Sequence, residues 1–113
     1  MLKLAIVNLS RQVYRGSLPS TLVSELRREQ VWICRRFAGE EIVLLTSDSP
    51  HMNGRVLLIF PDKESVRLRS RDGEAFQMTF EETAMLAEKE GYLGLVLMMG
   101  SAWVEMDLFA AKL

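Results

Sequence analysis

The sequence predicts an α+β domain built on a mainly antiparallel β-sheet of about eight strands, curled or partly closed, with two helices. Only two stretches of the chain have the residue spacing of an amphipathic helix, whereas many short stretches are rich in β-branched and aromatic residues. Two helices are too few for a regular parallel β-α-β arrangement. The 113 residues suit one domain, and no linker or repeat divides them, so we expect a single domain over 1–113.

The N-terminal part predicts one strand and one helix. Residues 2–9 are mostly apolar and alternate loosely, which is typical of a strand. Leu18, Leu22 and Leu26 then recur at every fourth position, with charged residues between them. This spacing predicts an amphipathic helix over residues 19–30.

The middle of the chain predicts strands and turns. Residues 31–46 are rich in β-forming residues and are broken by an Ala-Gly-Glu turn, so we expect a hairpin. Residues 47–54 are polar and contain Pro, Asn and Gly, which predicts a loop. A strand is expected over 55–60. A second hairpin is expected to pair 65–70 with 75–80 around an Asp-Gly turn.

The C-terminal part predicts the second helix and two further strands. Thr79 and Glu82 have the spacing of a capping box, and Gly91 is suited to end the helix that follows. Residues 92–99 are almost wholly apolar and suit a buried central strand. Residues 102–109 alternate as a final strand, so the expected order is β-α-β-β-β-β-β-α-β-β.

Composition excludes several classes of site. The single cysteine, Cys34, excludes an internal disulfide and a cysteine-rich zinc site, and the single histidine, His51, excludes any metal site that needs two histidines from one chain. No glycine-rich phosphate loop is present, and we expect no cofactor. No apolar run is long enough to span a bilayer, and the first residues lack the pattern of a signal peptide, so we expect a cytoplasmic protein.

One predicted strand carries arginine at every second position, which suggests a nucleic-acid-binding face. Alternation would place Arg67, Arg69 and Arg71 on one side, and Arg35 and Arg36 would extend the row if their strand lies alongside. Guanidinium groups bind phosphate in bidentate fashion. The alternative is an ordinary solvated face, which the net charge of −1 favours.

Two polar groups resemble parts of active sites. Asp48, Ser49 and His51 combine a nucleophile, a base and an acid within the predicted loop, which is either a ligand-binding loop or simply a set of turn residues. Glu105 and Asp107 share one face of the last strand, as a pair of glycosidase carboxylates would, or they lie on a solvated face.

The apolar run in the C-terminal half is the candidate for a protein interface. Leu95, Leu97, Met98 and Met99 would form a pairing surface if their strand lay at the edge of the sheet. The alternative, which we favour, is a central core strand. Cys34 lies between Trp32 and Arg36 in the alternation, and a buried thiol is the expected reading.

The leading functional hypothesis is a non-catalytic interaction domain that self-associates or docks on a protein partner. Nucleic-acid binding through the arginine row is the alternative. A small ligand-binding protein or enzyme centred on the loop 47–54 is the third hypothesis, and no membrane partner is expected.

Overall fold

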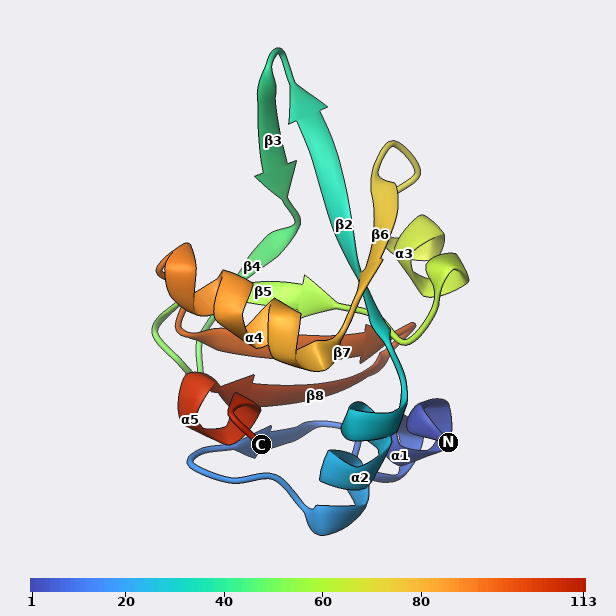
Figure 1. Ribbon diagram of the computed structural model, residues 1–113, viewed down its shortest axis with the longest axis vertical. Helices are drawn as coiled ribbons and strands as arrows, with labels where there is room; N and C mark the ends of the chain where they lie inside the picture. Colours follow the sequence, from blue (N-terminus) through green and yellow to red (C-terminus); the bar gives the residue numbers. More distant parts are fainter.

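The computed structural model describes all 113 residues and has five helices and eight strands in two sheets (Figure 1). The strands are β1 (Gln12–Tyr14), β2 (Val31–Ala38), β3 (Glu41–Leu44), β4 (Thr46–Ser49), β5 (Gly54–Ile59), β6 (Glu74–Met78), β7 (Gly94–Met99) and β8 (Ala102–Asp107). The helices are α1 (Leu2–Asn8), α2 (Ser20–Arg28), α3 (Lys63–Arg69), α4 (Phe80–Lys89) and α5 (Leu108–Ala111). The strand order is β1-β8-β7-β5-β4 in one sheet and β3-β2-β6 in the other.

The predicted α+β class is confirmed, but two details of the prediction are wrong. There are five helices rather than two. The larger sheet is mixed and open rather than antiparallel and partly closed, because β1 pairs with β8 and β5 pairs with β7 in parallel. None of the helices combines the length and hydropathy needed to span a bilayer.

The first predicted strand is helix α1. A strand would place Leu2, Leu4 and Ile6 on one face. In the structure Leu2 and Ile6 are buried one helical turn apart, whereas Leu4 is exposed. The backbone N–H of Leu2 donates to Glu29 Oε2 at 2.8 Å. Packing against α2 therefore outweighs the strand preference of this run.

The predicted strand 65–70 is helix α3. Asp62 is its N-cap, and the carboxylate accepts a hydrogen bond from the Ser65 backbone N–H at 2.8 Å. Val66, a residue of α3 itself, is fully buried. The expected hairpin with 75–80 is therefore wrong, and β6 pairs with β2 instead.

The other elements lie close to their expected positions. The 31–46 hairpin is present as β2 and β3, and Gly39 at its turn has a φ of 67°. Helix α4 has the predicted capping box between Thr79 and Glu82. Part of the predicted loop is strand β4, and the end of the predicted last strand is the short helix α5.

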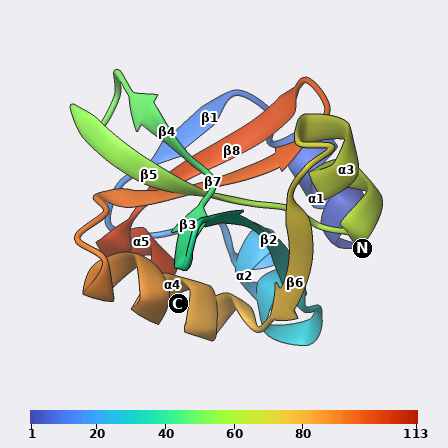
Figure 2. The ribbon, with the colours of Figure 1, turned by 90° about the horizontal axis from the view of Figure 1, so that it is seen from above.

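The larger sheet carries a core on each face. Helices α1, α2, α4 and α5 pack on one face, over residues such as Leu57, Leu95 and Val104. Figure 2 shows α2, α4 and α5 on one side of the sheet. The opposite face has a smaller core around Val56 and Leu58, which α3 and β2 cover in part.

Two short connections join the sheets. Trp32 in β2 and Phe60 after β5 exchange two backbone hydrogen bonds of 2.8 Å, which form an antiparallel bridge. Leu45 lies between β3 and β4, donates to the carbonyl of Cys34 and accepts from the N–H of Leu58. The chain therefore passes from one sheet to the other at Leu45, and the far end of the β2–β3 hairpin projects from the body (Figure 1).

Gly94 is required where β7 and β8 meet. A Cβ at this position would lie 2.2 Å from the backbone carbonyl oxygen of Met106. We expect Gly94→Ala to lower the free energy of unfolding by about 1–3 kcal/mol or more, because backbone atoms of both strands must move. Gly54→Ala is the matched control, since its Cβ would meet only the end of the Leu93 side chain. Urea unfolding of both variants measures the difference, and equal losses would contradict the prediction.

The Asp62 cap also predicts a pH dependence of stability. Burial alone would raise the pKa of Asp62, but hydrogen bonds from Lys3 and Ser65 outweigh it and hold the pKa below its usual value. The Lys3 Nζ lies 2.6 Å from the carboxylate. A carboxyl whose pKa is lower in the folded state stabilises the fold at neutral pH, and this contribution is lost as the pH falls from about 4 through the folded pKa.

We therefore expect Asp62→Asn to be less stable than the wild type at about pH 7, with the gap shrinking toward about pH 3. Urea unfolding at the two pH values measures it. Asp72→Asn is the control, because Asp72 makes no side-chain hydrogen bond or ion pair. A stability difference between the wild type and Asp62→Asn that stays constant between the two pH values would contradict a lowered pKa of Asp62 in the folded protein.

Candidate functional site

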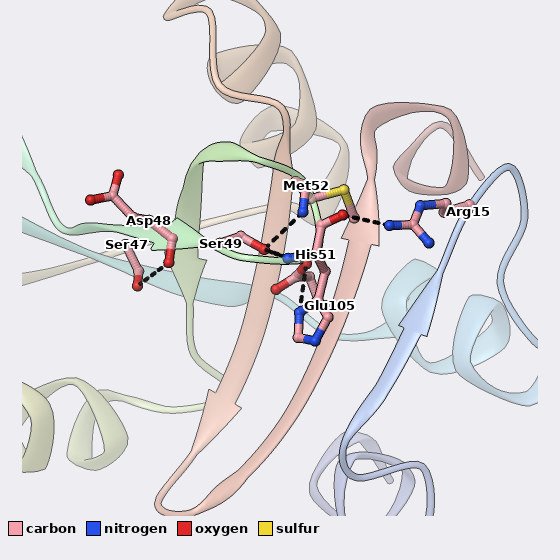
Figure 3. A network of polar contacts seen from close by, with 7 residues as sticks. All are labelled: Arg15, Ser47, Asp48, Ser49, His51, Met52 and Glu105. Atoms are coloured by element: carbon pink, nitrogen blue, oxygen red, sulfur yellow. Dashed lines mark hydrogen bonds and ion pairs between the residues drawn. The ribbon is translucent and has the colours of Figure 1, made fainter.

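A polar network on the less covered face of the larger sheet joins the predicted loop to β8 (Figure 3). Its centre is Glu105, which is only 4% exposed. The Ser49 hydroxyl donates to Glu105 Oε2 at 2.7 Å, and His51 Nδ1 lies 3.5 Å from the same oxygen. We call these three residues the Glu105 network. Two of the predicted loop residues, Ser49 and His51, thus share one carboxylate oxygen of Glu105 in β8.

The surroundings hold His51 in one position. Its imidazole stacks on the Trp103 ring with 5.7 Å between centroids, and the Arg15 guanidinium donates to its backbone carbonyl. Beside the network is a hollow of about 160 Å³, the Glu105 hollow. Its lining residues are Ser47, Asp48, Ser49, Pro50, His51, Val56, Leu58, Arg69, Val96, Met98, Trp103 and Glu105.

The network geometry does not suit nucleophilic catalysis by Ser49. A serine nucleophile needs a base that takes its proton and a lone pair directed at the substrate. The Ser49 side chain is buried, and its oxygen accepts hydrogen bonds from the backbone N–H groups of His51 and Met52, both at 3.2 Å. The hydroxyl therefore ties the loop to Glu105, and His51 and Glu105 are the groups left to contact a ligand.

The remaining predicted acids are not part of this network. Asp107 accepts hydrogen bonds from the backbone N–H groups of Gly16 and Ala110, and so caps α5. It therefore does not act with Glu105 as a pair of reacting carboxylates. Asp48 is exposed, and its nearest cationic group, Arg55 Nε, is 3.9 Å away.

The predicted arginine row does not exist, because its strand is helix α3. Arg67 and Arg69 lie two positions apart on a helix and so point in different directions. Arg35 is paired with Glu74 and lies over the Phe76 ring, and Arg36 donates to the Ser70 hydroxyl at 2.8 Å. Arg71 lies beyond the end of α3 and makes no ion pair. The alternating row is therefore not formed, although the bond to Ser70 places Arg36 beside the segment that carries Arg69 and Arg71.

The apolar run considered as an interface is a central strand. β7 lies between β5 and β8, and Leu95 and Leu97 are fully buried. Met98 and Met99 are partly exposed at its end. The Cys34 thiol is also fully buried, as expected for a structural cysteine.

The uncovered apolar surface lies instead on the smaller sheet. The register places Phe37 beside Ile42 and Phe76 beside Ile33, and alternation along β2 puts these side chains on one side together with Leu44. Phe37 is 61% exposed, Ile42 55% and Phe76 40%. We call Phe37, Ile42, Leu44 and Phe76 the hairpin face. It borders the outer edge of β3, which pairs with no other strand.

A larger hollow of about 570 Å³ lies between α2, α4 and α5. Its walls are mainly apolar side chains such as Leu26, Phe80 and Met85. The charged groups around it, such as Arg27 and Glu88, come from different helices, and Arg27 donates to the carbonyl of Leu113 at 2.8 Å. No buried polar group is directed into it, so its shape alone indicates no chemistry.

Comparison with protein-family models, curated proteins and solved structures finds no match to this chain. The geometry of the site and of the hairpin face is therefore the basis for the function proposed below.

Glu105 and Trp103 are the site residues whose role the sequence analysis missed. Glu105 was paired with Asp107 because the two share a strand face. The available signal was an ionisable residue between Val104 and Met106 in a strand that is otherwise largely apolar, which indicates a carboxylate with an internal partner. The identity of that partner depended on the strand order.

Ser49 should anchor the loop through its hydroxyl. We expect Ser49→Ala to lower the free energy of unfolding by about 1–3 kcal/mol, because two backbone N–H groups and a buried carboxylate lose their partner. Amide exchange at His51 and Met52 should become faster. The control is Ser47→Ala, since the Ser47 hydroxyl makes only a long 3.4 Å contact to a neighbouring carbonyl. If both variants behave alike in hydrogen exchange, Ser49 does not anchor the loop.

Proposed function

We propose that this protein is an interaction domain that pairs with a second copy of itself through the outer edge of β3. The observation that carries the proposal is the exposed hairpin face beside an unpaired strand edge. Free strand edges pair readily with other strands, and clustered exposed apolar side chains mark interaction surfaces. The projection of the hairpin from the body leaves this edge open to a partner (Figure 1).

The charges of the hairpin face favour a second copy as the partner. Its two charged neighbours, Arg35 and Glu74, are already bonded to each other. The face is therefore close to neutral and does not repel an identical face. A twofold axis perpendicular to the sheet keeps the hairpin faces of both copies on the same side.

The register that fits best is antiparallel and centred on Val43. It places Ile42 opposite Leu44 of the second copy on the hairpin face, so the two apolar stripes become continuous. Glu41 then lies opposite Leu45 of the second copy, so no two carboxylates face each other. Because β3 has only four residues, most of the stabilisation must come from apolar contacts rather than from hydrogen bonds.

The two other functions expected from the sequence have less support. Nucleic-acid binding was expected from an arginine row that is not formed. Catalysis at the loop 47–54 was expected from a serine whose hydroxyl is buried and bonded to Glu105, which leaves ligand binding as the part of that hypothesis with support. Strand addition by a segment of another protein would use the same edge and is an outcome of the test below.

Val43→Lys tests the proposed dimer. The change places two ammonium groups opposite each other at the twofold axis, and directly opposed like charges destabilise strand pairs. We expect the wild type to dimerise with rising concentration in sedimentation equilibrium, and the variant to need at least about tenfold more protein.

Leu68→Lys is the matched control, because Leu68 is exposed on α3, away from β3. It should dimerise like the wild type. A wild type that stays monomeric at every concentration overturns self-pairing. If that monomer binds an extended peptide at β3, the edge is a binding site for a segment of another protein.

A further inference from the structure

The Glu105 carboxylate has one oxygen without a partner in the protein. Oε2 accepts the Ser49 hydroxyl and faces His51, whereas Oε1 accepts no hydrogen bond from any protein group. The Glu105 side chain is 95% buried and lines the Glu105 hollow, and solvent reaches Oε1, so this oxygen is open to a hydrogen-bond donor in the hollow.

The hollow selects a small ligand. Its volume of about 160 Å³ is roughly five times the ~30 Å³ that a water molecule takes up in the liquid, and drug-sized ligands need about 300 Å³ or more. Val56, Leu58 and Val96 form apolar walls. A charged group held between such walls interacts more strongly with Glu105 than it would in water.

Charged side chains of both signs line the hollow. Glu105 supplies a buried carboxylate and Asp48 an exposed one, whereas Arg69 supplies an exposed guanidinium that makes no hydrogen bond or ion pair with the protein. The His51 imidazole lies beside Glu105 and stacks on Trp103. Asp48, His51 and Glu105 all line the hollow, but no three such side chains are grouped closely enough to hold a metal ion.

We propose that the Glu105 hollow binds a small zwitterion, with its ammonium group on Glu105 Oε1 and its anionic group at Arg69. An ammonium donates charge-assisted hydrogen bonds, which suits the free carboxylate oxygen. A guanidinium binds a carboxylate in bidentate fashion. The volume of the hollow leaves room for only a few carbon atoms between the two charged groups. This site is separate from the β3 edge and does not depend on self-pairing.

Nuclear magnetic resonance titration of the ¹⁵N-labelled full chain tests the site with three probes. β-Alanine carries both charged groups, ethylammonium only the cation and propionate only the anion. We expect saturable shifts of the Trp103 indole N–H and the His51 amide with β-alanine, weaker binding of ethylammonium and none of propionate. Propionate binding as tightly as β-alanine, or no saturable shift with any probe, overturns the proposal.

Two variants assign the two ends of the ligand. Glu105→Gln keeps the shape and removes the charge, and should weaken both ammonium probes by about tenfold or more. Arg69→Ala changes an exposed residue, so the fold is expected to persist, and should lower the affinity for β-alanine to that for ethylammonium.

Arg71→Ala is the matched control, since Arg71 is exposed nearby but does not line the hollow. Equal effects of the Arg69 and Arg71 changes overturn the zwitterion assignment, as does unchanged binding in a folded Glu105→Gln. Val43→Lys should bind β-alanine like the wild type, which separates this result from that of the dimer test.

Discussion

The structure depends on β5, whose side chains are buried on both faces. Leu57 and Ile59 belong to the core under the helices, whereas Val56, Leu58 and Phe60 belong to the core on the other face. The strand also joins the two sheets, because Phe60 exchanges two hydrogen bonds with Trp32. A strand held in this way has little freedom to shift its register, since a shift of one residue would exchange its two faces. The hairpin face and the Glu105 hollow both take their positions from this strand.

Sequence signals within a few residues predicted some elements correctly, but they failed where contacts with distant parts of the chain decide between helix and strand. Helix α4 was predictable because Thr79 and Glu82 satisfy its first backbone N–H groups within four residues of sequence. Helix α3 carried a comparable signal in Asp62 and Ser65, but the alternating arginines suggested a strand. Helix α1 has no side-chain cap at its N-terminus, and its packing against α2, β7 and β8 stabilises it as a helix. A short apolar run gives no basis for choosing between the two structures.

The two candidate surfaces were predictable only in part. Ser49 and His51 were identified from the sequence, yet their partner Glu105 lies more than 50 residues away and meets them only through the order β4-β5-β7-β8. The apolar run of β7 was considered as an interface because an apolar sequence looks the same in a buried central strand and in an exposed edge strand. The 31–46 hairpin was expected as well, but its exposure follows from the division into two sheets, and no local pattern encodes that division.

The parallel pairing of β1 with β8 determines when the fold forms during synthesis. Gln12 is aligned with Val104 and Tyr14 with Met106, so the edge of the larger sheet joins residues from opposite ends of the chain. Strand β1 emerges from the ribosome early and has no partner until β8 has been made. Contacts between such distant residues form slowly, because a long segment must be ordered before they contribute. Strand β1 therefore docks only after β8 has been made, so this edge is the last part of the larger sheet to be completed.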